Sequence, residues 1–268
     1  CLVAVYGKRF HAGERSAFPA LVSVASTLLV YTLSAEVFTF LDDSLNVRNL
    51  VVVALWAAYG LGIMIVGLWR GWAWLRVQGW SLSVMVIGMT VTTLNYGHLL
   101  MDKDPLHPIV NFSFGAFAIC ISMVCALACL VASNRKRFHG AEAGFFPVLV
   151  LVANFLALWA GSSEVITFVR DSENARNLVL VAIWSTYGLG LVAAGIRKNW
   201  DWLRMAGYLM AVVATVATLG LLNHGEATVR SGTYMPVLNP SLGGFAICVA
   251  ALYLYACAVA KNRERLHD

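Results

Sequence analysis

Long apolar stretches alternate with short polar connections along the chain, and eight of these stretches reach membrane-spanning length. An α-helix needs about 20 apolar residues to cross a hydrocarbon core about 30 Å thick. The eight stretches cover residues 18–41, 50–69, 77–101, 109–133, 145–169, 178–196, 205–223 and 237–260. The pattern therefore predicts an all-α integral membrane protein with eight transmembrane helices.

The apolar pattern repeats at an offset of 128 positions without a gap. At this offset Phe18-Pro19 meets Phe146-Pro147, and about two in five of the positions from 17 to 124 are identical to their counterparts. Since each copy holds four apolar stretches, we expect two tandem four-helix repeats that run parallel, both entering the membrane in the same sense. The predicted divisions are 1–16, the end of a preceding repeat and a cytoplasmic linker; 17–135, the first membrane repeat; and 136–268, a linker and the second membrane repeat.

The first residues of the chain also follow this register. Cys1-Leu2-Val3-Ala4 aligns with Cys129-Leu130-Val131-Ala132, the end of the fourth apolar stretch. The register predicts that the chain begins inside a helix of a still earlier repeat of a longer protein. The alternative is a processed amino terminus such as a lipidated cysteine.

Composition and charge support a membrane protein and indicate its orientation. The chain is 60% hydrophobic and 12% charged, whereas about a quarter of the residues of a soluble domain are charged. Of the 19 Lys and Arg residues, 14 fall on the side that holds both termini. The positive-inside rule then predicts cytoplasmic termini. Membrane lipids with anionic headgroups are the expected partners, with other membrane subunits as a further class, and no nucleic acid is expected.

Each repeat carries one carboxylate near the outer end of its first helix. Glu36 lies in the block Ser34–Phe40, and Glu164 is its counterpart. A carboxylate at this depth is costly unless it is paired or reaches water, so it marks a candidate functional site. Three interpretations stay open: an ion pair with Arg48 or Arg176, a binding or proton-relay role, or simple exposure.

Other polar residues lie toward the same outer side of the membrane, at the ends of the third and seventh stretches. They are Asn95, His98, Asn223 and His224. Together with Glu36, Arg48, Glu164 and Arg176 they form the candidate polar or binding site. The alternative is that they only form hydrogen bonds with neighbouring helices.

Four asparagines are predicted to cap helices. Asn49 and Asn177 directly precede apolar stretches, Asn239 precedes Pro240, and Asn111 is the counterpart of Asn239. An Asn side chain accepts a hydrogen bond from the first free amides of a helix, and proline is favoured in the first helical turn.

A repeated motif of large rings and glycines lies in the second helix of each repeat, at Trp56–Gly62 and Trp184–Gly190. Glycines one turn apart let a neighbouring helix approach closely, so helix packing is the preferred interpretation and ligand stacking the alternative. The cysteines of the apolar stretches lack histidine or carboxylate neighbours, so no metal site is expected. No cofactor is expected either.

The order of the repeated motifs resembles a known family. Ser-x-Glu closes one helix, Trp-x-x-Tyr-Gly-Leu lies in the next, Leu-Arg-x-x-Gly follows a basic turn, and Leu-Asn-Pro-Ser-Leu-x-x-Phe opens the fourth. In the second repeat the matching residues are Glu164, Trp184, Tyr187, Gly188, Gly195, Arg204, Gly207, Asn239 and Phe245. This order resembles the bacterial membrane proteins grouped as domain of unknown function 2339. The resemblance implies a long multi-pass chain in a bacterial inner membrane. The chain departs from the family at Leu219, Asn223 and Gly225, where Lys and Asp are usual.

Three functions stay open at this point. The first is a non-enzymatic scaffold or assembly component of a membrane system, because the repeated residues are mostly glycines, interfacial aromatics and caps. The second is a carrier or channel for a small polar or anionic solute, with Glu36 and Glu164 lining a vestibule. The third is a membrane enzyme that acts on a lipid-linked substrate. The chain holds no recognisable catalytic motif, so no catalytic residue is assigned.

Overall fold

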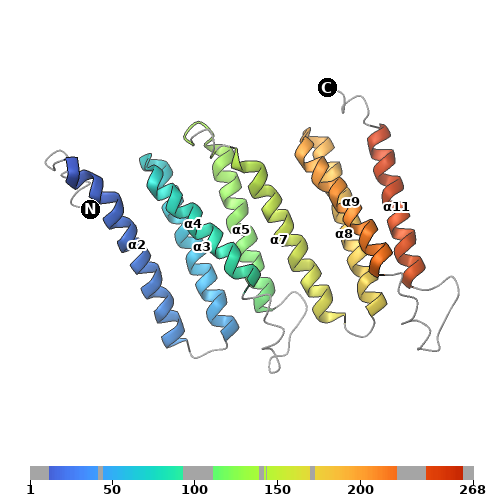
Figure 1. Cartoon of the computed structure of the whole chain (residues 1–268), viewed down its shortest axis with the longest axis horizontal. Coiled ribbons are helices and arrows are strands. Elements are labelled where there is room, and N and C mark those ends of the chain that lie inside the picture. Colours follow the sequence, from blue (N-terminus) through green and yellow to red (C-terminus); the bar gives the residue numbers. More distant parts are fainter. Residues whose placement is uncertain are drawn as a thin grey trace. The chain divides into compact units, whose positions relative to one another are not determined.

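The computed structural model describes residues 12–41, 45–92, 111–138, 142, 144–169, 173–221 and 240–261, and over these ranges it is all-α, with eight helices and no strand (Figure 1). The helices are α2 (Ala12–Phe40), α3 (Leu45–Arg70), α4 (Ala73–Thr92), α5 (Phe112–Ser133), α7 (Phe145–Phe168), α8 (Glu173–Lys198), α9 (Asp201–Leu221) and α11 (Pro240–Lys261). The expected all-α class is therefore confirmed for the described residues.

The chain forms two compact units, Cys1–Ala153 and Asn154–Asp268. The boundary between them falls inside α7, so the part of this helix up to Ala153 belongs to the first unit and the longer part from Asn154 to the second unit. The divisions predicted from the sequence, at 17–135 and 136–268, stay a prediction.

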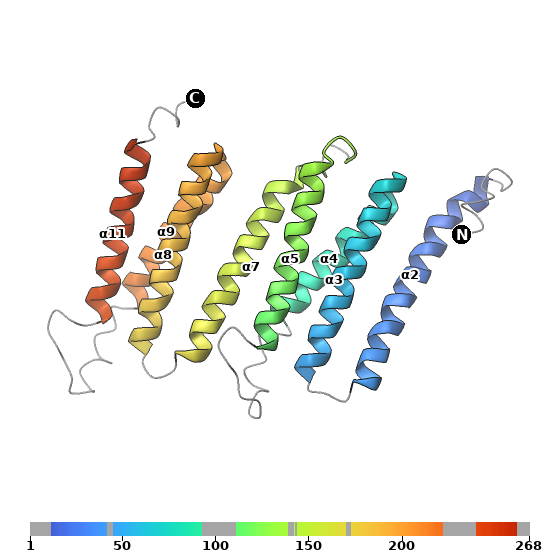
Figure 2. The same ribbon diagram turned by 180° about the vertical axis from the view of Figure 1, so that it is seen from behind.

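In the first unit, α3 packs most extensively on α4. Helix α5 packs on α3 and makes a smaller contact with α4, while α2 has the sparsest packing of the four. Consecutive helices run in opposite directions, which places the start of α2, the α3–α4 turn and the end of α5 at one end of the unit (Figures 1 and 2). The core includes Met64, Phe117 and Leu127, each of which is at most 2% exposed.

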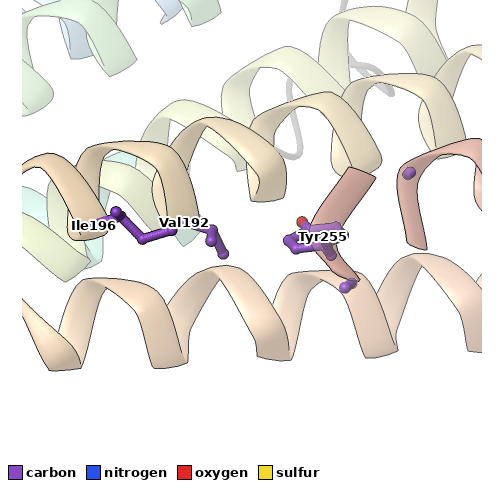
Figure 3. Close-up of a cluster of buried hydrophobic side chains, with 5 residues drawn as sticks. Val192, Ile196 and Tyr255 are labelled. Carbon is purple, nitrogen blue, oxygen red and sulfur yellow. The ribbon is translucent and has the colours of Figure 1, made fainter. Parts of the chain in front are cut away.

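The second unit repeats this packing order. Helix α8 packs most extensively on α9, and α11 packs on α8 with a smaller contact to α9. A cluster of buried side chains joins the three helices: Val192 and Ile196 from α8, Ala211 from α9, and Ala251 and Tyr255 from α11 (Figure 3). The aliphatic and aromatic surface removed from water or lipid here holds the three helices together.

The turns that join α3 to α4 and α8 to α9 have the same backbone geometry. Gly71 and Asn199 both have positive φ, at 69° and 53°. The amide of Trp72 donates to the carbonyl of Gly67 at 2.8 Å, and the amide of Trp200 donates to the carbonyl of Gly195 at 2.9 Å. These are the hydrogen bonds of a Schellman motif, in which a left-handed Gly or Asn ends the helix.

Six helical segments within the described ranges are long and apolar enough to cross a membrane. They are Ala17–Phe40, Val47–Arg70, Phe112–Ser133, Phe145–Phe168, Ala175–Lys198 and Asp201–Gly220. Helix α11 contributes a shorter apolar stretch, and the predicted span 77–101 continues beyond the described part of α4. Six such helices indicate a multi-pass membrane protein, whereas eight spans stay a prediction.

Candidate functional site

The two repeated carboxylates differ in their surroundings. Both lie in the last two turns of their helices, Glu36 in α2 and Glu164 in α7. Glu36 is exposed, whereas Glu164 is half-buried. The two carboxylates thus differ in burial, and the three interpretations of their role stay predictions.

The two arginines expected to pair with these carboxylates make other interactions. The Nε atom of Arg48 donates to the carbonyl oxygen of Leu41 at 2.6 Å, which ties the end of α2 to the start of α3. Arg176 lies 3.8 Å from Glu173, one turn earlier on α8. The contacts described for these two arginines are therefore with Leu41 and Glu173.

The remaining polar candidates, Asn95, His98, Asn223 and His224, lie outside the described residues. Asn239 also lies outside them. Of the polar site proposed from the sequence, only its two carboxylates and two arginines lie among the described residues, with one Glu and one Arg in each unit.

The predicted caps have different outcomes. Asn111 caps α5, because its side-chain oxygen accepts a hydrogen bond from the amide of Phe114 at 2.8 Å. Asn49 and Asn177 instead lie inside their helices, since α3 begins at Leu45 and α8 at Glu173. Each helix includes one polar turn before its apolar stretch, and for that reason the apolar pattern placed the starts too late.

The repeated residues that the structure does bring together form hydrogen bonds between helices. The indole Nε1 of Trp56 in α3 donates to the hydroxyl of Ser34 in α2 at 2.8 Å. The same bond recurs 128 positions later, from Trp184 in α8 to Ser162 in α7, at 2.9 Å. These contacts join α2 to α3 and α7 to α8.

A second pair of hydrogen bonds follows the same register with a change of partner. The Tyr59 hydroxyl shares a hydrogen bond with the Ser26 hydroxyl at 2.6 Å. At the corresponding place the Tyr187 hydroxyl donates to the side-chain oxygen of Asn154 at 2.5 Å. The ring motif expected to pack or to stack on a ligand thus uses its polar atoms for contacts between helices.

We expect the Trp184–Ser162 bond to contribute about 1 kcal/mol to stability, the usual net value of a hydrogen bond between transmembrane helices. Trp184→Phe and Ser162→Ala should each lower the free energy of unfolding, and the double variant should cost less than the sum. Unfolding in bicelles, followed by the helical circular dichroism signal in the far ultraviolet, measures this coupling energy. The cycle of Trp56→Phe with Ser34→Ala is the matched control, and full additivity in both cycles would contradict the assignment.

Two glycines of the motif, Gly60 and Gly188, lie where the next helix approaches closely, whereas a Cβ atom on Gly62 or Gly190 would meet nothing within 4 Å. A Cβ atom built on Gly207 would lie 2.8 Å from the carbonyl oxygen of Gly188 and 2.9 Å from the amide nitrogen of Val192. In the first unit, a Cβ atom on Gly79 would lie 3.2 Å from the carbonyl oxygen of Gly60. The packing interpretation therefore agrees with the described contacts at Gly60 and Gly188.

A shallow apolar hollow of about 380 Å³ runs along one face of α8. It is lined by Ile183, Thr186, Tyr187, Gly190 and Leu191. Its lining offers a phenol whose hydroxyl is already bonded to Asn154, and it holds no charged group. This hollow lacks the converging polar groups that orient a small polar ligand.

A buried ion pair that the sequence analysis missed lies near the start of α4 in the first unit. Arg76 in α4 is 2% exposed, and its guanidinium meets the carboxylate of Glu142 with two N–O distances of 3.2 Å. The guanidinium also lies over the ring of Phe138, 5.9 Å from the centroid. This pair connects α4 to the residues that lead into α7.

The counterpart of Arg76 in the second unit is Arg204, which has a different partner. Arg204 pairs with Asp201, three residues earlier on α9, and donates to the side chain of Asn199. Asp201 is 81% exposed at its side chain. The recurrence of arginine at both positions, and of glutamate at 14 and 142, was the signal in the sequence that could have identified this position.

Stacked tryptophans adjoin both arginines. The rings of Trp72 and Trp74 stack at 5.7 Å, and those of Trp200 and Trp202 stack at 5.3 Å. Phe18 contacts the first pair edge-on. Aromatic rings beside arginine are typical of a membrane–water interface.

Groups suited to metal or covalent chemistry do not converge in the part of the chain that the structure describes. No group of three or more His, Cys, Asp or Glu side chains gathers there. The five described cysteines, Cys120, Cys125, Cys129, Cys248 and Cys257, are all free thiols. The described geometry thus offers contacts between helices as its main repeated chemistry.

Comparison of the chain with protein-family models, curated proteins and solved structures finds no match.

Proposed function

We propose that the chain is a non-enzymatic membrane scaffold or assembly component, built from two tandem four-helix repeats. The observation that carries this proposal is that residues recurring at the 128-residue offset form contacts between helices. Trp56 and Trp184 bind serines of the neighbouring helix at equivalent positions, and the glycine pairs hold the next helix in close contact. Residues kept for packing are what a structural repeat requires.

The finer architecture belongs to this proposal. It comprises eight spans, cytoplasmic termini and a bacterial inner membrane. The bounds of α3 and α8 are displaced by 128 residues, as are the first residues of α4 and α9, and this agreement supports the tandem repeat. In the first unit, the start of α4, which carries Arg76, and the end of α5, two residues before Arg135, lie at the same end of the unit (Figure 1), the end that the charge bias predicts to be cytoplasmic. The resemblance to domain of unknown function 2339 stays a prediction.

A carrier for a small polar or anionic solute is the second candidate. The observation that favours it is Glu36, an exposed carboxylate on a helix long and apolar enough to span a membrane. Such residues are often functional. The different burial of Glu164 weighs against two equivalent gates, because a pair of matched carboxylates would share one environment.

We expect the double variant Glu36→Gln/Glu164→Gln to retain the assembly that the wild-type chain forms in native membranes. The neutral amides preserve size and leave the described contacts between helices in place. The measurement is native mass spectrometry of the tagged chain, extracted in lipid nanodiscs, compared with flux of small anions into proteoliposomes. A wild-type chain that is recovered alone contradicts the scaffold, and a flux abolished by the double variant establishes the carrier.

A further inference from the structure

The carbonyl oxygen of one glycine accepts a hydrogen bond from a hydroxyl in both units. In the first unit the Ser83 hydroxyl donates to the Gly79 carbonyl oxygen at 2.8 Å. In the second unit the Tyr255 hydroxyl donates to the Gly207 carbonyl oxygen at 3.3 Å. The two glycines correspond at the 128-residue offset, whereas the two residues that carry the hydroxyls do not. The hydroxyl therefore comes from α4 in the first unit and from α11 in the second.

The residues that correspond to these two hydroxyl-bearing residues are apolar. Ala211 stands at the place of Ser83, and Leu127 stands at the place of Tyr255. All four residues are buried. Each unit thus combines one hydroxyl and one apolar residue at this pair of positions, with the two roles reversed between the units. Such a reversal is expected where two side chains share one space in a close-packed interior.

The two hydroxyls also lie against the same glycine of the neighbouring helix. A Cβ atom built on Gly60 would lie 3.9 Å from the hydroxyl oxygen of Ser83. A Cβ atom built on its counterpart, Gly188, would collide with the hydroxyl of Tyr255. Tyr255 belongs to the buried cluster that joins α11 to α8 and α9 (Figure 3). Ala211→Ser would therefore add a second hydroxyl next to the one that Tyr255 already places beside Gly188.

We propose that this pair of positions determines which last helix, α5 or α11, each pair of preceding helices accepts. Helices α3 and α4, with Ser83, accept a helix that carries leucine, as α5 does at Leu127. Helices α8 and α9, with Ala211, accept a helix that carries tyrosine, as α11 does at Tyr255. Each repeat then assembles with its own last helix, although the two repeats are closely related in sequence. The inference depends on the 128-residue correspondence and not on the scaffold function.

Both mismatched combinations destabilise the core in which they occur. Leu127→Tyr brings a larger ring and a second hydroxyl to a carbonyl group that Ser83 already contacts, and overpacking of this kind is unfavourable. Tyr255→Leu removes the ring and the hydroxyl from the glycine crossing, and Ala211 is too small to replace them, so a cavity remains. The second residue of each pair should relieve the defect, through Ser83→Ala in the first unit and Ala211→Ser in the second.

Exchange variants of the full chain test this matching. Leu127→Tyr and Tyr255→Leu together give each last helix the residue of the other, and we expect the unfolding equilibrium constant in bicelles to rise about tenfold or more. The four-residue exchange, which adds Ser83→Ala and Ala211→Ser, should recover most of that loss. A two-residue exchange as stable as the wild type overturns the proposal. A four-residue exchange that is no more stable than the two-residue exchange, or that fails to fold, overturns it as well.

The hydrogen bond of the second unit is tested separately. Tyr255→Phe keeps the ring and removes the hydroxyl, so the unfolding equilibrium constant should rise about fivefold, the factor that corresponds to one buried hydrogen bond. Tyr208→Phe is the matched control, because the Tyr208 ring packs against the same cluster, with its centroid 6.4 Å from that of Tyr255. Equal effects of the two changes would show that the hydroxyl at the Gly207 carbonyl contributes nothing specific, and that result also overturns the proposal.

Discussion

Replacing Gly207 with alanine is expected to destabilise the second unit by about 2–3 kcal/mol, the cost of overpacking a closely packed contact. The added Cβ atom would meet the Gly188 carbonyl oxygen at 2.8 Å and the Val192 amide nitrogen at 2.9 Å. Both are backbone atoms of α8, so no side-chain rotation can relieve the overlap. Helices α8 and α9 must move apart, which loosens the most extensively packed pair of the unit.

Two glycines on the same helices provide the control. A Cβ atom on Gly190 of α8 or on Gly220 of α9 would meet nothing within 4 Å. Alanine at either position should be neutral or stabilising by about 0.5–1 kcal/mol, because alanine favours the helix. Thermal unfolding in detergent, followed by helical circular dichroism, separates the three variants. A Gly207→Ala melting temperature equal to that of Gly190→Ala would contradict the close approach.

The first unit offers a graded comparison. At Gly79 the added atom would lie 3.2 Å from the Gly60 carbonyl oxygen and 3.2 Å from the Cβ atom of Met64. The neighbours there need to shift by only a few tenths of an ångström. We therefore expect Gly79→Ala to cost less than Gly207→Ala, although the two glycines correspond to each other at the 128-residue offset.

The helices were predictable from the sequence because their signal is local. A stretch of about 20 apolar residues specifies a spanning helix without reference to any other part of the chain. The starts of α3 and α8 were placed too late, since Leu45–Asn49 and Glu173–Asn177 are polar turns that continue the helix beyond its apolar part. Hydropathy marks the apolar region of a helix, whereas hydrogen bonds determine where it begins.

The contacts between helices were less predictable. The bond of Trp56 to Ser34 joins two helices at a separation of 22 residues, and the pair of Arg76 with Glu142 spans 66 residues. No periodicity within one helix indicates such a partner. The residues of both pairs do recur at the 128-residue offset, which singles them out in the sequence. The partner of Tyr187 does not recur, because Asn154 stands where the partner of Tyr59 is Ser26.

The carboxylates show the limit of reasoning from the repeat. Glu36 and Glu164 occupy the same place in closely similar motifs, yet one is exposed and the other is half-buried. Their helices differ in surroundings, because Leu28 of α2 is exposed where the matching Leu156 of α7 is buried. A repeated residue therefore shares its position in the helix with its counterpart, while its burial depends on what packs beside that helix.

Glu142→Gln is the second change from which we expect a large effect, a loss of about 3 kcal/mol of stability. Its carboxylate neutralises Arg76, whose side chain is 3% exposed, while Glu142 itself is 16% exposed. Removing one partner of a buried ion pair costs about 3–5 kcal/mol, because the remaining charge stays buried without compensation. The partial exposure of Glu142 places the expected value at the lower end of that range.

The double variant Arg76→Met/Glu142→Gln separates the charge from the packing. Methionine keeps most of the apolar stem against Phe138 and removes the buried charge, so the double variant should recover much of the stability that Glu142→Gln loses. Asp201→Asn is the matched control in the second unit. Asp201 is 81% exposed at its side chain, and a pair with an exposed partner contributes about 0–1 kcal/mol. Unfolding free energies in bicelles give all three values. If Glu142→Gln lowers the unfolding free energy no more than Asp201→Asn does, the guanidinium of Arg76 is solvated by water. That result would contradict a buried ion pair between α4 and the residues that precede α7.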